Sequence, residues 1–153
     1  PFSKIYNGLA KRGRTTSSKH DRFWIIADVE EMLERLSQHY PLAVVSARDA
    51  LSTEHFMEHF KLKDYFTAIV TAQTCEHTKP YPDPVLYAAQ QIGVEPDACV
   101  MIGDTIVDIH AGKSAGAQTV AVLCGFGTQK ELKRAGADLI LKTTADIIDI
   151  LQG

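Results

Sequence analysis

The sequence predicts an α/β fold, a Rossmann-like parallel sheet with helices on both faces. Apolar segments of strand length alternate with amphipathic segments of helix length along most of the chain, as in parallel α/β proteins. The strand segments are continuous apolar runs, which is the pattern of strands covered by helices on both sides. The length of 153 residues suits one domain with a core of useful size.

The elements follow one another in a regular order. Strands are expected at 23–26, 42–47, 66–72, 99–104, 119–124 and 138–141, and the helices that follow them at 29–39, 50–60, 83–92, 107–114, 128–135 and 144–151. Asp28 and Glu31 predict a capping box at the start of the first helix. Pro82 and Pro84 fit a helix start, and Gly112 and Gly116 fit the end of the fourth helix.

Residues 1–21 are polar and basic and lack apolar periodicity, so they are interpreted as a linker or as a remnant of something larger. The domain is expected to span residues 22–153.

Composition excludes several classes of protein. Apolar residues make up 45% and charged residues 23% of the chain, which rules out bulk disorder. The net charge of −3 argues against a nucleic-acid or anionic membrane partner, and no apolar run approaches the roughly 18 residues of a membrane span. The three cysteines are far apart, so we expect neither disulfides nor zinc, and a cytoplasmic location. The sequence leaves the oligomeric state unknown.

Chemically useful residues follow three of the predicted strands. Ser46 follows one strand, Lys79 lies in the loop after the next, and Asp104 and Asp108 follow the strand at 99–104. The carboxyl ends of parallel strands meet at one edge of a sheet, where ligands bind. The hydroxyl of Ser46 and the amides that follow it suit phosphate oxygens, and Lys79 supplies a positive charge. The two aspartates supply oxygen ligands for Mg²⁺.

Each of these residues also has a purely structural interpretation. Ser46 and Asp104 could be helix N-caps, Asp108 could be favoured by the helix dipole, and Lys79 could be a solvated loop charge. Arg48 could meet a substrate phosphate or simply face water. Their joint placement after successive strands favours the functional interpretation.

Three segments resemble motifs of the haloacid dehalogenase (HAD) superfamily, in particular its phosphoglycolate phosphatase-like branch. They are VVSARD, HTKPYPDPVLYAAQQIGVEP and VMIGDTIVDIHAGKSAGAQTVAV, and the resemblance covers about residues 28–153. It implies a catalytic role for Lys79 and Ser46, phosphate binding by Ser46, Ala47, Arg48 and Lys79, and Mg²⁺ binding by Asp104 and Asp108. Asp104 would be the direct ligand.

One part of the family pattern has no match in this chain. The first motif of the family is a strand that ends in Asp-x-Asp-Gly-Thr and carries the nucleophile, and no such string occurs here. In the family that strand lies between the strands that end at Ser46 and at Asp104. We therefore expect the central N-terminal strand to be missing. An unfilled slot would leave backbone groups of two buried strands unpaired, so something must fill it.

Three explanations compete. The chain could be the C-terminal part of a longer protein, with residues 1–21 as the end of a helical cap. Alternatively, residues 22–27 could fill the slot and place Asp28 at the strand end. Finally, the chain could be a noncatalytic relative, or a partner could donate the strand.

The resemblance implies a Mg²⁺-dependent phosphatase of a small phosphorylated metabolite that uses an aspartyl-phosphate intermediate. The nucleophile is absent from this chain, so we expect the chain alone to be inactive. A noncatalytic phosphate- or metal-binding module and a HAD phosphomutase are the alternatives.

Overall fold

A computed structural model describes residues 3–6 and 25–152. Its centre is a six-stranded parallel sheet with the strand order β3-β2-β1-β4-β5-β6. The strands are β1 (Ser3–Tyr6), β2 (Leu42–Val45), β3 (Ala68–Val70), β4 (Cys99–Gly103), β5 (Gln118–Val122) and β6 (Leu139–Leu141). The α/β class and the parallel sheet predicted from the sequence are therefore confirmed.

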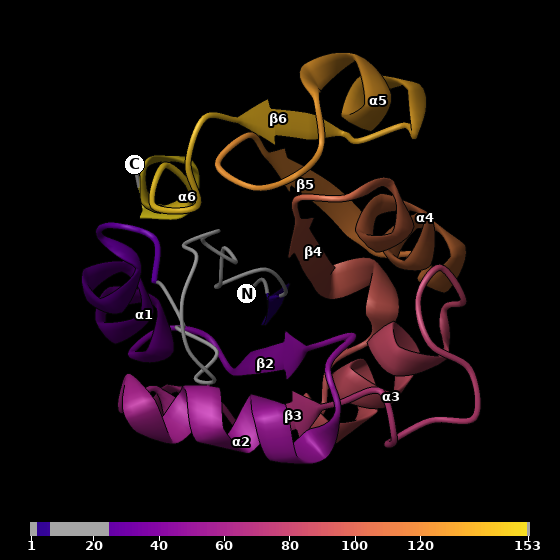
Figure 1. Ribbon diagram of the computed structural model, residues 1–153. Helices are drawn as coiled ribbons and strands as arrows, with labels where there is room; N and C mark the ends of the chain where they lie inside the picture. The colour runs from indigo at the N-terminus through magenta and orange to yellow at the C-terminus, as the bar shows by residue number, and fades with distance from the viewer. Residues whose placement is uncertain (1–2, 7–24, 153) are drawn as a thin grey trace, which may run out of the picture.

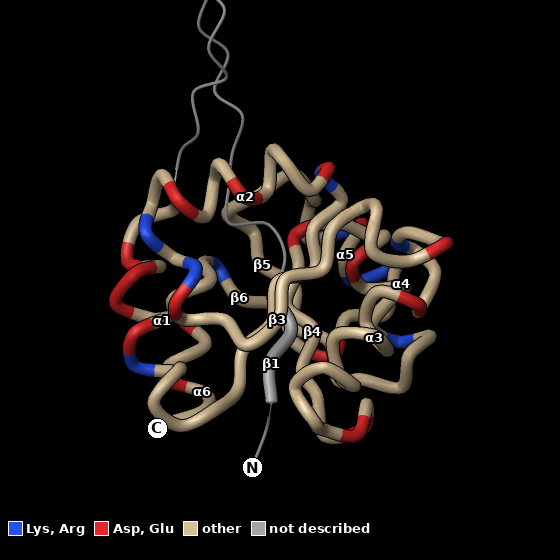
Figure 2. The backbone as a smooth tube through the Cα atoms, turned by 90° about the horizontal axis from the view of Figure 1, so that it is seen from below, with Lys and Arg blue, Asp and Glu red and all other residues tan. Residues whose placement is uncertain are grey.

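Helices cover both faces of the sheet, so the molecule has three layers (Figures 1 and 2). The helices are α1 (Val29–Ser37), α2 (Ala50–His59), α3 (Asp83–Ile92), α4 (Ile106–Ala115), α5 (Gln129–Arg134) and α6 (Ile147–Gln152). Two short 3₁₀ helices, Lys63–Tyr65 and Pro96–Ala98, precede β3 and β4. Helices α1, α2 and α6 share one core cluster with the sheet, α3 and α4 share a second on the other face, and α4 and α5 share a third, smaller one.

Alternate side chains of each strand face opposite sides of the sheet, so the core lies in two layers, one on each face. In β2, Leu42 and Val44 pack with α1 and α2, whereas Ala43 and Val45 pack with α3 and α4. All four residues are buried, which explains why the strand reads as one apolar run. The same holds for β4, whose five residues are all buried.

Most predicted elements appear within a few residues of their expected ends. The main exception is 23–26: Ile25 makes only an isolated bridge, and residues 23 and 24 lie outside the described residues. The capping box expected of Asp28 is also wrong. Asp28 does precede α1, but its φ of 64° is left-handed and its side chain makes no capping hydrogen bond.

The expectation of a missing central strand is corrected by β1. Residues Ser3–Tyr6 lie between β2 and β4 and pair with both, with Ile5 opposite Ala43 and Met101. They therefore belong to the sheet and not to a linker. Residues 22–27 do not fill this slot, because their described part, 25–27, contains no strand. The interpretation of residues 7–21 as a linker or cap remnant lies outside the described residues.

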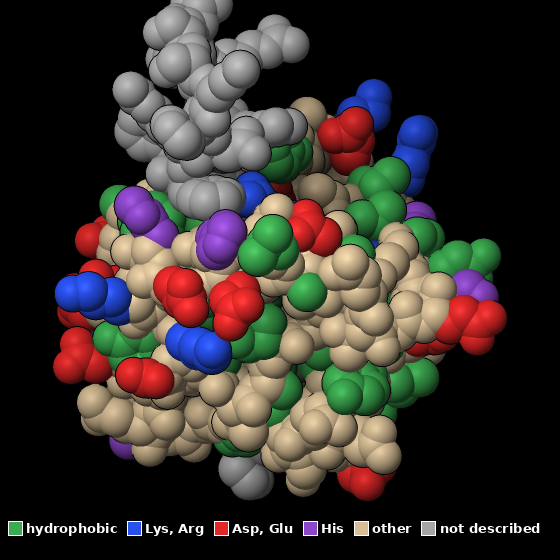
Figure 3. Space-filling model, turned by 60° about the horizontal axis from the view of Figure 1, so that its bottom comes forward, with side chains coloured by type: hydrophobic (Ala, Val, Ile, Leu, Met, Phe, Trp, Pro, Cys, Tyr) green, Lys and Arg blue, Asp and Glu red, His purple; other side chains and the backbone are tan. Residues whose placement is uncertain are grey.

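Charged side chains of both signs lie at the surface, in agreement with the small net charge of −3. On the face shown in Figure 3, acidic, basic and hydrophobic side chains are interspersed. Within the described residues, no helix is long and apolar enough to cross a membrane.

Candidate functional site

The loops after β2, β3 and β4 carry the four side chains singled out from the sequence. Ser46 follows β2 directly, Lys79 lies between β3 and α3, Asp104 follows β4, and Asp108 lies in the first turn of α4. The first two loops are joined to each other. The amide of Ala72 donates to the carbonyl of Arg48 over 2.8 Å.

Lys79 and Asp108 form a buried ion pair. The Nζ of Lys79 lies 2.7 Å from Oδ1 of Asp108, and the two side chains are 2% and 0% exposed. The same ammonium donates to the carbonyl of Val45 over 3.0 Å, one residue before Ser46. A lysine ammonium has three protons, so these two contacts leave one that no acceptor among the described residues takes. The structural alternative of a solvated loop charge is therefore wrong for Lys79.

Asp108 has both carboxylate oxygens engaged by protein groups. Oδ1 accepts from Lys79, and Oδ2 accepts from the amide and hydroxyl of Thr105, over 3.0 and 2.7 Å, and from the amide of Asp104 over 3.2 Å. These contacts make Asp108 the second member of a capping box with Thr105. Asp108 therefore joins Lys79 to the start of α4 and has little capacity left for a cation.

The carboxylate of Asp104 has fewer hydrogen-bond partners than that of Asp108. Asp104 is 5% exposed, and its Oδ2 accepts a hydrogen bond from the amide of Phe126 over 2.9 Å. Among the described residues, Oδ1 of Asp104 has no hydrogen-bond partner. Asp104 does not cap α4, because Thr105 is the N-cap.

The chemistry of these donors decides how they fit Mg²⁺. Mg²⁺ keeps several waters and accepts one or two protein carboxylates, and among the described residues Asp104 has a carboxylate oxygen available for such a cation. Among residues 25–152, no cluster of three or more His, Cys, Asp or Glu side chains could hold a metal ion. The described residues thus supply one carboxylate for Mg²⁺ and not a complete protein cage.

Ser46 lies at the start of a turn that leads into α2. Its Oγ accepts from the amide of Arg48 over 3.1 Å and lies 3.4 Å from Oγ1 of Thr53, whose one hydroxyl proton goes to the Asp49 carbonyl over 2.8 Å. Asp49, and not Ser46, caps α2 by accepting from the amide of Ser52.

The backbone amides expected to bind phosphate differ in availability. The amide of Ser46 donates to Val70, and that of Arg48 donates to Ser46. The amide of Ala47 has no partner among the described residues. The guanidinium carbon of Arg48 lies 6.0 Å from the centroid of the Phe56 ring, where the side chain packs against α2. Ala47 is therefore the best amide donor of this turn.

Burial sets the electrostatics of the site. Desolvation lowers the pKa of Lys79, and the nearby Asp108 carboxylate opposes that shift. Desolvation raises the pKa of Asp104, whereas the hydrogen bond from Phe126 favours its charged form. A bound cation would compensate the buried charge of Asp104.

Three contributors were missed by sequence reasoning. They are the carbonyl of Val45, the hydroxyl of Thr53 and the amide of Phe126. Two of them are backbone groups that any residue would carry, so no side-chain pattern marks them. The third, Thr53, lies in α2 seven residues after Ser46, with non-helical backbone between them, so the spacing is only a weak signal.

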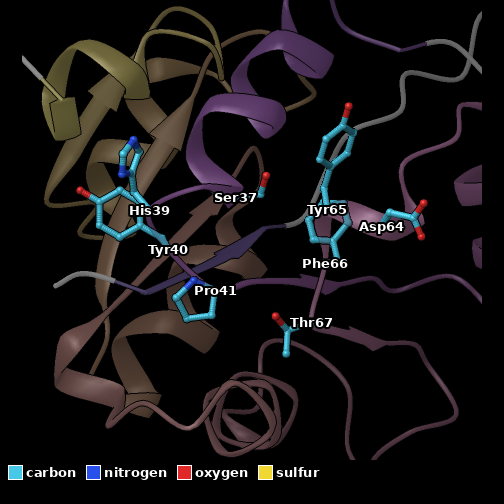
Figure 4. Close-up of a pocket in the computed structure, with 8 residues that line it drawn as sticks. All are labelled: Ser37, His39, Tyr40, Pro41, Asp64, Tyr65, Phe66 and Thr67. Carbon is cyan, nitrogen blue, oxygen red and sulfur yellow. The ribbon is translucent and has the colours of Figure 1, made fainter.

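A hollow of about 430 Å³ lies at the opposite edge of the sheet, before β2 and β3. Its walls include Tyr40, Asp64, Tyr65 and Phe66. Figure 4 shows the hydroxyls of Tyr40 and Tyr65 and the carboxylate of Asp64 pointing in different directions. Its polar groups do not converge, so it is not the candidate site.

The fold and the site define a doubly wound α/β protein with a buried lysine–aspartate pair and a second carboxylate, that of Asp104, at the carboxyl ends of its strands. The chain belongs to the haloacid dehalogenase-like hydrolase family, whose model matches residues 7–122.

Its curated relatives include two proteins named pyrophosphatase PpaX. That of Oceanobacillus iheyensis is 32% identical over 157 residues, which cover 98% of this chain and 73% of the relative. That of Bacillus cereus is 31% identical over 122 residues, which cover 80% of this chain and 56% of the relative. The chain thus spans little more than half of the Bacillus relative.

Two solved structures share the fold. A predicted phosphoglycolate phosphatase from Haemophilus somnus has a TM-score of 0.76 at 29% identity, covering 84% of this chain and 57% of that one. A putative β-phosphoglucomutase from Thermotoga maritima has a TM-score of 0.78 at 25% identity, covering 86% and 61%. The resemblance to the HAD superfamily stated from the motifs is confirmed.

Proposed function

We propose that this chain carries the phosphate- and Mg²⁺-binding part of a phosphatase that acts on a small phosphorylated metabolite. The observation that carries the proposal is the buried pair of Lys79 and Asp108 together with the carboxylate of Asp104, one oxygen of which has no hydrogen-bond partner among the described residues. The names of the relatives, pyrophosphatase and phosphoglycolate phosphatase, support a phosphorylated substrate.

Each residue has a defined part in the proposed chemistry. Ser46 donates its hydroxyl proton, and Ala47 its amide, to oxygens of the transferring phosphoryl group. Lys79 directs its third proton to the same group, and Asp108 keeps Lys79 charged and in place. Arg48 is proposed to act through its backbone, which shapes the turn, and less through its guanidinium. Such preorganised donors stabilise charge that develops in the transition state.

Asp104 is the proposed ligand of Mg²⁺. Asp108 accepts a hydrogen bond from the Asp104 amide and so holds the backbone of that ligand in place. When bound, Mg²⁺ would neutralise phosphoryl charge and help to orient the substrate. The family chemistry also needs a nucleophilic aspartate that forms an aspartyl phosphate. The Asp-x-Asp-Gly-Thr string is absent here, and Ser3–Tyr6, in the central slot, contain no aspartate. We therefore propose that the chain alone turns over little or no substrate.

The test is phosphate release by the protein isolated from its natural source. We expect Mg²⁺-dependent release of phosphate from a small phosphomonoester or pyrophosphate, and loss of that release on Asp104→Ala. Transfer of phosphate within a substrate, without release, would favour a phosphomutase, for which the β-phosphoglucomutase neighbour provides a precedent. Phosphate binding without either reaction would favour a noncatalytic module.

A second measurement addresses this chain. Steady Mg²⁺-dependent hydrolysis of p-nitrophenyl phosphate by the 153-residue chain, abolished by Asp104→Ala, would contradict its proposed inactivity. The intact mass of the natural protein, compared with 16.8 kDa, would show whether a further segment supplies the nucleophile.

A further inference from the structure

The loop between β5 and α5 contacts the side chain and the carbonyl of Asp104, whereas Asp108 contacts the Asp104 amide. This loop contains the sequence Gly125-Phe126-Gly127. The amide of Phe126 donates to Oδ2 of Asp104 over 2.9 Å, and the amide of Gly127 donates to the Asp104 carbonyl over 2.8 Å. One short segment thus fixes both the side chain and the backbone of the same aspartate.

The two glycines make this approach possible. A Cβ atom on Gly125 would collide with Oδ2 and the side-chain carbons of Asp104. A Cβ atom on Gly127 would lie 2.5 Å from the carbonyl oxygen of Asp104, which is backbone and cannot rotate away. Neither glycine has the positive φ that would explain its presence by a turn. Close contact with Asp104 is therefore the physical reason for both glycines.

These contacts restrict the direction of Oδ1, the second carboxylate oxygen of Asp104. With Oδ2 held by Phe126, rotation of the carboxylate costs a hydrogen bond at a buried position. Oδ1, which has no partner among the described residues, is then held in one direction. Groups that orient a metal ligand in this way typically change metal affinity about 10- to 100-fold when they are removed.

We propose that Gly125, Gly127 and the Phe126 amide are positioning groups that fix Asp104 for cation binding. This proposal rests on the proposed function, in which Asp104 is the Mg²⁺ ligand. It assigns a role in that site to a loop that follows a different strand, β5, and that none of the sequence motifs includes.

The test uses Mn²⁺ alone as the probe, with free Mn²⁺ measured by electron paramagnetic resonance in titrations of the full chain. We expect Gly125→Ala to weaken Mn²⁺ binding at least tenfold, close to the effect of Asp104→Asn. The matched control is Gly112→Ala. Its Cβ would lie 2.8 Å from Met101 and Thr119 in the core, so it also strains the protein but leaves the Asp104 carboxylate untouched. We expect Mn²⁺ binding by that variant to stay within twofold of wild type.

A second readout needs no metal. The Phe126 amide should exchange its proton slowly in the wild-type chain and at least tenfold faster in Asp104→Ala, because its acceptor is gone. Unfolding in urea would establish that each variant is folded.

The outcomes separate the two proposals. Wild-type Mn²⁺ binding by Gly125→Ala, together with loss of binding in Asp104→Asn, would overturn the positioning role and leave the metal site standing. Equal binding by wild type and Asp104→Asn would overturn the metal assignment, and the positioning role for cation binding with it. Unchanged exchange of the Phe126 amide in Asp104→Ala would overturn the hydrogen bond on which the inference depends.

Discussion

Lys79 and Asp108 lie 29 residues apart in the sequence and form a buried ion pair with Nζ and Oδ1 separated by 2.7 Å. The pair joins the loop after β3 to the start of α4, across the strand positions of β2, β1 and β4. It thus connects the phosphate-binding side of the proposed site to the side that carries Asp104.

Breaking this pair should destabilise the fold. Lys79→Met leaves the Asp108 charge buried without its cation, and we expect a loss of about 3 kcal/mol in the free energy of unfolding. Adding Asp108→Asn removes the stranded charge and should make the double variant less destabilised than the two single effects predict. Urea unfolding of the four proteins gives the coupling energy.

A solvent-exposed pair provides the control. Lys113 and Asp138 are 42% and 51% exposed, and Lys113→Met should cost at most about 1 kcal/mol. Equal losses for Lys79→Met and Lys113→Met would contradict the claim that burial makes the first pair important.

Asp138 should make stability depend on pH. The hydrogen bond from Lys113 and those from Thr119 lower the pKa of Asp138. A lowered folded-state pKa adds stability above the unfolded value of 3.8, and that stability is lost as pH falls through the folded pKa. Asp138→Ala should therefore cost about 1 kcal/mol or less at pH 7, because the carboxylate is half exposed.

The pH-dependent part of this cost should disappear in acid. Urea midpoints of wild type and Asp138→Ala, measured from pH 7 to below the folded pKa, should converge. A difference that stays constant over this range would show that packing, and not the charge, is responsible.

The hydroxyl of Thr53 should orient Ser46. Thr53 is buried, and its Oγ1 donates to the Asp49 carbonyl and contacts the Oγ of Ser46. Thr53→Val should cost about 1 kcal/mol and reduce the shift of the Ala47 amide resonance on titration with inorganic phosphate. Thr53→Ser keeps the hydroxyl and should restore the shift, whereas no recovery would point to packing alone.

The central position of β1 can be tested through its backbone. Proline cannot donate a ladder hydrogen bond and is confined to edge strands, so Ile5→Pro should cost about 3 kcal/mol or more. Ile5→Val keeps the amide and is the control. Unfolding midpoints that are the same for both variants would contradict pairing of β1 with its two neighbours.

Much of the fold was predictable because local patterns agree with it. β2 and β4 are long apolar runs covered on both faces, and the residues after them meet at one edge of the sheet. Ser46, Asp104 and Asp108 could be chosen on that basis, and Lys79 could be chosen from its place in the loop after β3.

β1 could not be predicted from its own residues. Two of its four residues are Ser3 and Lys4, so it has no continuous apolar run. The need for a strand there came from the family resemblance and from the backbone groups of β2 and β4 that would otherwise be unpaired, and neither shows which segment supplies it. The capping box predicted at Asp28 is wrong for a different reason. The sequence pattern is correct, but the left-handed backbone of Asp28 prevents the side chain from capping α1.

The two larger core clusters differ in the size of their side chains. On the α1 and α2 side the buried residues are Leu, Ile, Val, Met and Phe without any alanine, whereas the α3 and α4 side includes Ala88, Ala89, Ala111 and Ala115. Large side chains can exchange volume with their neighbours, but closely packed alanines leave no room for growth. We therefore expect core positions on the two faces of the sheet to accept substitutions at different rates during evolution. The helix that holds Asp108 should change slowly, and most tolerated variation in the core should collect on the other side of the sheet.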